Sequence, residues 1–124
     1  MKYLRAFENF IYREVEESIP DSLYRKGDFF SKLVINKKEI GTFHYRLEND
    51  TFHLIEIEVH SEFRGMKYGD KLMQEIINKA KELSKKRIIL EVLSTNSNAI
   101  NLYRKYGFKE YDSDTLFVKM EFYI

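Results

Sequence analysis

The stretch EFRGMKYGDKLM, residues 62–73, places an arginine and two glycines directly before an amphipathic run. Arg64 is followed at once by Gly65, and Gly69 stands four residues later. Unpaired backbone N–H groups at the start of a helix, with the helix dipole behind them, favour an anion such as phosphate. Arg64 would add a charge-assisted contact. The same glycines also suit a plain strand-to-helix turn, so these residues alone leave both interpretations open.

The elements on either side of this loop are predicted from two different periodicities. Residues 51–60 alternate strictly, which predicts a strand. One face would carry His53, Ile55, Ile57 and Val59, and the other Leu54, Glu56, Glu58 and His60. Helical spacing predicts a helix over residues 69–84. Its apolar stripe would comprise Leu72, Met73, Ile76, Ile77, Ala80 and Leu83.

The rest of the chain supplies a sheet and further helices. Apolar residues at helical spacing predict a helix over residues 3–18, which Pro20 and Asp21 end. Residues 29–35 and 40–47 read as an antiparallel hairpin with its turn at 36–39. Residues 87–93 read as a buried strand, and a short helix with Ala99, Leu102, Tyr103 and Tyr106 on its apolar face ends at Gly107. Strands are expected at 108–111 and 115–124.

The order of elements predicts an α/β (α+β) fold. The strand–helix–strand unit over residues 52–93 should be parallel and right-handed, and the other strands antiparallel. At 124 residues the chain is long enough for one domain, so we expect a single domain over 1–124. Its sheet would be mixed, mostly antiparallel and covered by helices on both faces.

Composition excludes several classes of protein. The formal net charge is +1, whereas a dedicated nucleic-acid-binding domain is usually strongly basic. The chain has no cysteine, and its three scattered histidines lack the spacing of a metal site, so we expect no metal. No apolar run is long enough to span a membrane, and the first residues lack the features of a signal peptide. We therefore expect a cytoplasmic protein that binds neither nucleic acid nor membrane.

Two stretches of the sequence resemble the GNAT N-acetyltransferase superfamily. Residues 57–72, IEVHSEFRGMKYGDKL, are similar to its motif A, the acyl-CoA pyrophosphate loop, usually Arg/Gln-x-x-Gly-x-Gly/Ala. Residues 90–108, LEVLSTNSNAINLYRKYGF, are similar to its motif B, in the family order and at a family-like separation. One residue departs from motif A: Lys67 stands where the family most often has its first motif glycine.

The resemblance implies a sheet whose fourth and fifth strands splay apart, here residues 52–60 and 87–93. It implies that the pantetheine arm of acetyl-CoA lies in the gap, along the backbone of Ile57, Glu58 and Val59. The pyrophosphate would sit on the loop formed by Arg64, Gly65, Met66, Lys67, Tyr68 and Gly69. The amine would enter from the opposite side. Because lysine still offers its N–H and adds a charge, we expect the loop to bind coenzyme A with help from the Lys67 ammonium.

Motif B implies roles for two residues of the second stretch. Tyr103 matches the tyrosine that protonates the departing thiolate, although a core aromatic at helical spacing would look the same. Asn96 matches an asparagine near the cofactor, and it would also serve as a plain N-cap. Tyr106 matches a usually aliphatic position and is expected to pack.

The general base is the most open assignment. Glu91 matches a glutamate used as base in the branch that acetylates ribosomal-protein N-termini, and we rank it first. It would otherwise be a strand carboxylate paired with a lysine or facing solvent. His53, Glu56 and Glu58 are further options. The two glutamates would either line the acceptor cleft or lie on a solvated face.

The resemblance therefore implies an acetyl-CoA-dependent N-acetyltransferase acting on a primary amine of a small molecule or of a peptide or protein N-terminus. The alternative is an acyl-CoA-binding or regulatory module that does not catalyse. The final strand could also pair with a second copy of the chain to form a homodimer.

Overall fold

The computed structural model describes residues 28–124. The helix predicted over residues 3–18 and the loop after it lie outside this range. The described part contains β1 (Asp28–Ile35), β2 (Lys38–Glu48), β3 (Thr51–Val59), a 3₁₀ turn η1 (Ser61–Phe63), α1 (Tyr68–Glu82), β4 (Arg87–Leu93), α2 (Ser97–Lys105), β5 (Lys109–Ser113) and β6 (Phe117–Tyr123). Every strand and helix predicted in this range is therefore present, with shifts of a few residues at their ends.

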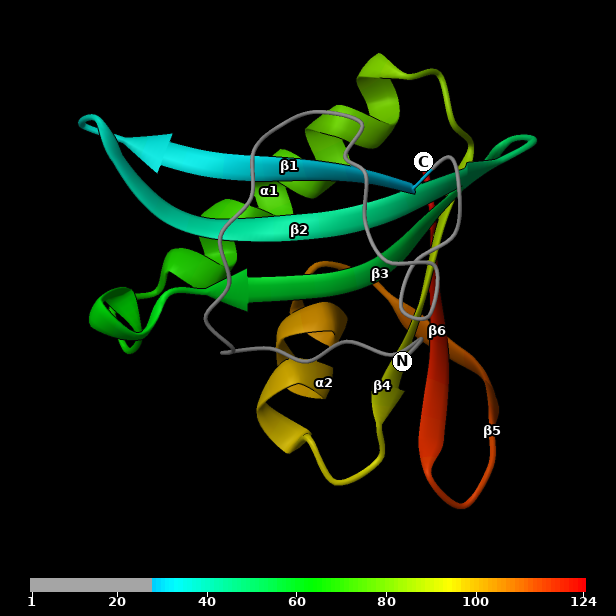
Figure 1. Ribbon diagram of the computed structural model, residues 1–124. Helices are drawn as coiled ribbons and strands as arrows, with labels where there is room; N and C mark the ends of the chain where they lie inside the picture. Colours follow the sequence, from blue (N-terminus) through cyan, green and yellow to red (C-terminus); the bar gives the residue numbers. More distant parts are fainter. Residues whose placement is uncertain (1–27) are drawn as a thin grey trace.

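The six strands form one sheet in the order β1-β2-β3-β4-β6-β5. Only β3 and β4 are parallel, and all other neighbours are antiparallel, which confirms the predicted mixed sheet (Figure 1). β6 lies between β4 and β5, so the final strand is not an edge that could pair with a second copy. The sheet edges are β1 and β5, and the homodimer stays a prediction.

The first hairpin turns in two residues, not the four expected. Asn36 and Lys37 both have positive φ, 52° and 67°. Positive φ at both central residues is typical of a type I′ turn, whose twist matches that of the flanking strands. Strand β2 therefore begins at Lys38, two residues before the predicted start.

A bulge in β3 corrects the predicted faces of that strand. Tyr45 lies opposite Leu54 and His44 opposite Glu56, so Ile55 is an extra residue in the ladder. Each bulge reverses the alternation, which is why Leu54 faces the same core as Ile57 and Val59. Ile55 is buried but stands outside that core cluster. The expectation that Ile55 shares a face with Ile57 and Val59 is therefore wrong.

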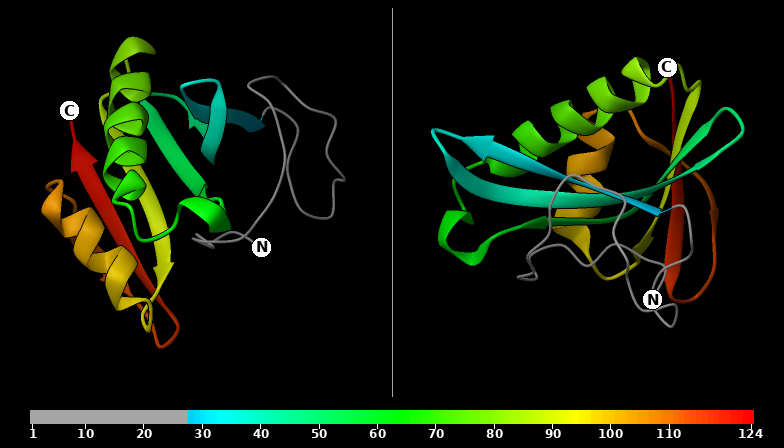
Figure 2. Two further views of the ribbon diagram at one scale, coloured as in Figure 1. Left: turned by 90° about the vertical axis from the view of Figure 1, so that its left-hand side faces the viewer. Right: turned by 45° about the horizontal axis from the view of Figure 1, so that its top comes forward.

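Both described helices cover one face of the sheet (Figure 2). α1 buries Leu72, Met73, Ile76 and Ala80, and α2 buries Ala99, Ile100 and Tyr103, all in one core cluster with the strands. Ile77 and Leu83 pack partly buried at its edge, as predicted. Leu116 lies in the turn before β6 and is exposed, so it does not share the buried face of Val118 and Met120. Helices on the second face stay a prediction.

β3 and β4 pair along half of their length and then diverge. Thr51 to Leu54 pair with Arg87 to Leu90, and no pairing joins β3 to β4 beyond those residues. Figure 1 shows the two strands separating at the end of the sheet where α2 lies. This confirms the predicted splay, and it places the end of β3, the start of α1 and α2 around one opening.

Candidate functional site

A pocket on the helix-covered side occupies the opening between β3 and β4. It is lined by Ile57, Glu58, Val59, Gly69, Asn98, Ala99, Leu102 and Tyr103, and we call it the helix-side pocket. The structure thus brings the predicted strand segment 57–59 together with Gly69 and Tyr103. The strand segment and Tyr103 lie more than 40 positions apart in the sequence, and Gly69 lies between them.

The loop before α1 carries two residues in the left-handed region. Gly65 has φ +78°, and Lys67 has φ 63°. A Cβ on Gly65 would meet nothing within 4 Å, so this glycine is required by its backbone conformation alone. Lys67 is the N-cap of α1 and makes no side-chain capping bond. The glycine that the resemblance predicts here is therefore replaced by lysine at a position with positive φ, at a cost of about 1 kcal/mol.

Gly69 serves a different purpose from Gly65. It lies inside α1, and a Cβ there would come 3.3 Å from Cδ2 of Leu102. Gly69 therefore lets the first turn of α1 approach α2 closely beside the pocket. Met66 is exposed, and the ring of Tyr68 meets the ring of Phe63 edge-on, with centroids 5.9 Å apart.

Arg64 fastens this loop to the strand before it. Its Nε donates a hydrogen bond of 3.1 Å to the carbonyl oxygen of Val59. Part of the guanidinium is therefore committed to the junction between β3 and the loop. A contact between Arg64 and phosphate stays a prediction.

Tyr103 is fully buried in α2 and lines the helix-side pocket. Among the residues that the structure describes, its hydroxyl has no hydrogen-bond partner. Burial raises the pKa of Tyr103 far above its ordinary value, so the hydroxyl keeps its proton at neutral pH. A buried hydroxyl without a partner is costly, and such groups concentrate at functional sites.

Asn96 fills one of the two roles that the sequence predicted for it, the N-cap of α2, and its contact with the cofactor stays a prediction. The side chain of Asn96 accepts a 3.2 Å hydrogen bond from the backbone N–H of Ala99, so Asn96 is the N-cap of α2. Asn98 instead lines the pocket, as does Leu102 four residues later. Residues four apart share a helix face, so the spacing of Asn98 and Leu102 places them together once the first turn of α2 is known.

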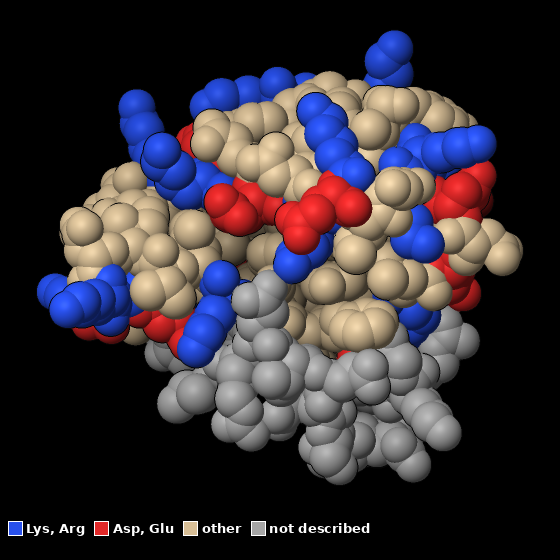
Figure 3. Space-filling model, turned by 90° about the horizontal axis from the view of Figure 1, so that it is seen from above, with Lys and Arg blue, Asp and Glu red and all other residues tan. Residues whose placement is uncertain are grey.

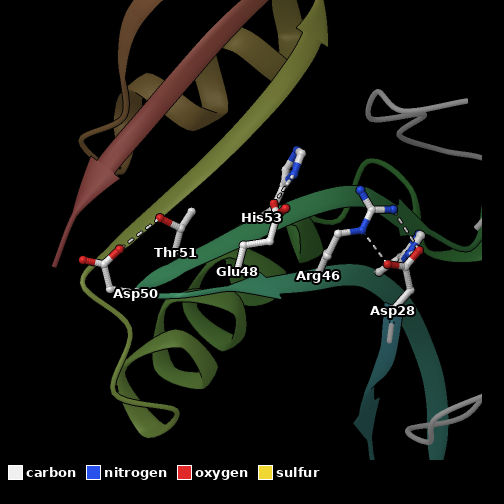
Figure 4. A network of polar contacts seen from close by, with 7 residues as sticks. Asp28, Arg46, Glu48, Asp50, Thr51 and His53 are labelled. Atoms are coloured by element: carbon white, nitrogen blue, oxygen red, sulfur yellow. Dashed lines mark hydrogen bonds and ion pairs between the residues drawn. The ribbon is translucent and has the colours of Figure 1, made fainter. Parts of the chain in front are cut away.

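A second hollow lies at the start of the splay and is lined by Glu48, His53, Ile89, Leu90, Glu91, Tyr111 and Lys119. We call it the far-side hollow, because Glu91 alternates with Leu90 and Val92, which pack into the helix-side core. Nδ1 of His53 lies 3.7 Å from Oε1 of Glu48 (Figure 4). Glu91 stands opposite Lys119 in the register. Tyr103 and Glu91 thus border different hollows on the two sides of the sheet.

Buried charges extend from this side of the sheet towards β1. Arg46 donates from Nε and Nη2 to the carboxylate of Asp28, at 2.6 and 3.0 Å, and Nε2 of His44 lies 2.9 Å from the same carboxylate (Figure 4). Glu56 and Glu58 are 7% and 4% exposed, so the alternative that they lie on a solvated face is wrong. Glu58 borders the helix-side pocket, whereas Glu56 lines neither hollow.

The described residues add no metal or membrane feature. Within residues 28–124, no three histidine, cysteine or acidic side chains come together as a group that could hold a metal ion. No helix in that range is both long and apolar enough to cross a bilayer. The face in Figure 3 interleaves Lys and Arg with Asp and Glu.

Comparison with known proteins gives consistent matches. The model of the acetyltransferase (GNAT) family matches residues 2–108. An uncharacterized N-acetyltransferase of Dictyostelium discoideum is 38% identical over 71 residues, which are 51% of this chain and 33% of that protein. An N-alpha-acetyltransferase of Sulfurisphaera tokodaii is 41% identical over 59 residues, 47% of this chain and 35% of that protein. The chain thus matches about a third of the length of each of these curated relatives.

The fold also matches solved structures. An N-acetyltransferase of Campylobacter jejuni, PseH, solved in complex with acetyl coenzyme A, superposes with a TM-score of 0.73 at 22% identity. The match covers 80% of this chain and 70% of that one. At this level of identity the likeness concerns the fold.

Proposed function

The chain belongs to the acetyltransferase (GNAT) family, and from that premise we propose that it transfers an acetyl group from acetyl-CoA directly to a primary amine. The acceptor would be a small molecule or a peptide or protein N-terminus. The observation that carries the proposal concerns Tyr103, which lines the pocket at the splay and whose buried hydroxyl has no partner among the described residues. The name of the Sulfurisphaera relative, an N-alpha-acetyltransferase, supports the N-terminal class of acceptor.

The residues around the helix-side pocket suit acetyl-CoA as a cosubstrate. The loop with Gly65 and Lys67 presents backbone N–H groups at the start of α1, where a diphosphate would be held. Ile57 and Val59 offer strand backbone and apolar side chains to an extended arm. The cosubstrate would supply the acetyl group as an activated thioester.

Tyr103 would act as general acid. Because burial raises its pKa, Tyr103 keeps its proton in the resting protein and would have it available for the thiolate as it departs. The proton would pass from the phenol oxygen to the sulfur as the carbon–sulfur bond breaks. The phenolate left behind would then be reprotonated from solvent.

The open part of β3 would stabilise the charge that develops on the acyl oxygen. Beyond Leu54 the strand no longer pairs with β4, so every second backbone N–H of β3 points into the gap. A fixed backbone donor in such a place acts as an oxyanion hole. Its geometry is supplied by the fold and needs no side chain.

Glu91 would accept the proton that the attacking amine must lose. It borders the far-side hollow, so the amine would approach from the side of the sheet opposite to the helix-side pocket. His53 and Glu48 border the same hollow and give it a further titratable pair. Glu48 and Glu91 in the lining would favour a cationic amine as the incoming acceptor, and Lys119 would oppose them.

The alternative function, an acyl-CoA-binding module without catalysis, is favoured by one observation. Lys119 stands directly opposite Glu91, and an ion pair across the strands would withdraw the carboxylate from base chemistry. A thiol-release assay over a panel of amines and N-terminal peptides separates the two functions. Coenzyme A binding without turnover on any acceptor, and without slow hydrolysis of acetyl-CoA, would favour the binding module.

A further inference from the structure

A cluster of three polar side chains joins α1 to α2 beside the helix-side pocket. Nζ of Lys105 donates to Oδ1 of Asp70 at 2.7 Å, and the hydroxyl of Tyr106 donates to the same oxygen at 2.7 Å. The Tyr106 hydroxyl also lies 3.3 Å from the carbonyl oxygen of Asp70. We call these residues the Asp70 cluster. The sequence predicted that Tyr106 only packs, whereas its hydroxyl makes a hydrogen bond with Asp70.

The cluster lies where the sheet itself is discontinuous. Beyond Leu54 and Leu90, no strand pairing joins the half with β3 to the half with β4. At this end α1, which begins at the phosphate loop, and α2, which carries Tyr103, meet side by side (Figure 2). Asp70 directly follows the pocket residue Gly69, and Tyr106 stands one helical turn after Tyr103. Contacts between the helices therefore determine the width of the pocket.

The charge of Asp70 makes this position unusual for an anion site. A carboxylate in the first turn interacts well with the helix dipole but repels a second anion at the same N–H groups. Hydrogen bonds from Lys105 and then Tyr106 lower the pKa of Asp70, and Asp70 in turn raises the pKa of Lys105. The carboxylate is thus charged, but its charge is offset by donors from α2.

We propose that Asp70, Lys105 and Tyr106 act together as positioning residues that set the distance between the phosphate loop and Tyr103. They hold the Asp70 carboxylate against α2, so that the first turn of α1 stays available to the diphosphate of coenzyme A. This rests on the proposed function, because it presumes that the loop binds that diphosphate. None of the three residues lines the helix-side pocket, so their effect on the cosubstrate is exerted through the helices.

Calorimetry with coenzyme A on four single variants of the full chain tests this. Tyr106→Phe should raise the Kd about tenfold, since it loses a hydrogen bond to a charged group. Lys105→Met should raise the Kd about fivefold at most, because the Lys105 side chain is 62% exposed and its pair with Asp70 is screened by solvent. Lys105→Arg keeps the positive charge, so its Kd should stay within about twofold of wild type. Tyr123→Phe is the matched control, because Tyr123 lies on β6 at the paired end of the sheet, and its Kd should be unchanged.

Two further readouts separate positioning from plain stability. The effect of Lys105→Met should shrink at high salt, whereas that of Tyr106→Phe should persist, because only the former removes a charge. The KM for acetyl-CoA should rise more than kcat falls. A lower melting temperature with an unchanged Kd in both variants would overturn the proposal.

Amide hydrogen exchange of the protein without ligand gives an outcome independent of coenzyme A. The first turn of α1 should exchange faster in Tyr106→Phe and Lys105→Met than in wild type. If wild type fails to bind coenzyme A, the proposed function is overturned. The exchange rates of the first turn of α1 would still test whether the Asp70 cluster holds that turn. Unchanged exchange in both variants would overturn the positioning role by itself.

Discussion

The two ends of the seam between β3 and β4 are held together by different means. At one end, Thr51 to Leu54 share a hydrogen-bonded ladder with Arg87 to Leu90. The backbone N–H of Lys86 extends it with a 2.8 Å bond to the carbonyl of Asp50. At the other end the ladder is absent, and side chains of α1 and α2 hold the two halves together instead.

The paired end of this seam contributes mainly to the stability of the fold, whereas the open end contains the groups expected to take part in binding and catalysis. The paired end buries apolar side chains and satisfies its backbone, whereas the open end contains the Tyr103 hydroxyl without a described partner and the left-handed backbone of Lys67. Unsatisfied groups and backbone strain persist where the surroundings compensate for them, and they cluster at functional sites. We therefore expect substitutions at the paired end to change folding first and those at the open end to change binding or turnover first.

The largest effect is expected at the paired end. Leu54 is fully buried opposite Leu90, so Leu54→Ala should lower the free energy of unfolding by about 3 kcal/mol through lost burial and a new cavity. Denaturant unfolding measures it. Leu102→Ala is the matched deletion at the open end, and it should cost less stability but weaken coenzyme A binding more. Equal losses of stability with equal Kd values would contradict the comparison.

The second effect concerns turnover at the open end. Tyr103→Phe keeps the ring and removes the hydroxyl, so kcat should fall roughly 100-fold, or about 2.7 kcal/mol in the barrier. Stability should be unchanged or slightly higher, because the lost hydroxyl is buried without a described partner. Tyr45→Phe, in the core against Phe52, is the control and should leave kcat within a few-fold of wild type. Unchanged turnover in Tyr103→Phe would remove Tyr103 from the mechanism.

Prediction from the sequence succeeded where one local signal decides the structure. The splay was predicted through the resemblance of two motifs, and the stripe of α1 through its spacing. The bulge at Ile55 was not predicted, because strict alternation of residues 51–60 is typical of an unbroken strand. Only the pairing with β2 reveals the extra residue. The hydrogen bond between Tyr106 and Asp70 was not predicted either, because the two residues lie 36 positions apart in the sequence.

The candidate site divides in the same way. Gly69, Tyr103 and the strand segment 57–59 were predicted and lie together, whereas Asn98 was missed beside its neighbour Asn96. Only the direction of the first turn of α2 distinguishes a capping asparagine from one that lines the pocket. The left-handed conformation of Lys67 could be anticipated only as a missing glycine, because lysine itself carries no preference for positive φ.

A third and smaller effect is expected from a substitution of Lys67 at the open end, where stability and binding should change in opposite directions. Lys67→Gly removes the strain of a left-handed lysine, so the free energy of unfolding should rise by about 1 kcal/mol. Coenzyme A should nevertheless bind more weakly and with less dependence on salt, because the ammonium is lost. Asn49→Gly, at another position with positive φ but in the β2–β3 turn, is the control that should gain stability without changing the Kd. Binding as tight as wild type with the same salt dependence would show the ammonium to be irrelevant.

The smallest effect is the pH dependence of the contact that closes the open end. Hydrogen bonds from Lys105 and Tyr106 hold the pKa of Asp70 below its ordinary value. A carboxyl with a lowered pKa stabilises the folded state above its unfolded pKa, and this contribution is lost as the pH falls through the lowered value. The stability difference between wild type and Asp70→Asn should therefore be constant above about pH 5 and shrink in more acidic solution.

The pKa of Asp70 can be measured directly by following its carboxyl chemical shift by NMR as the pH is changed. In Tyr106→Phe and Lys105→Met the pKa of Asp70 should rise towards its ordinary value, because its donors are removed. Asp114 is an internal reference: backbone N–H groups of Leu116 and Phe117 lower its pKa, and neither belongs to α2. An Asp70 pKa that moved no more than that of Asp114 would mean that side chains do not hold the open end, and the distinction from the hydrogen-bonded end would lose its physical basis.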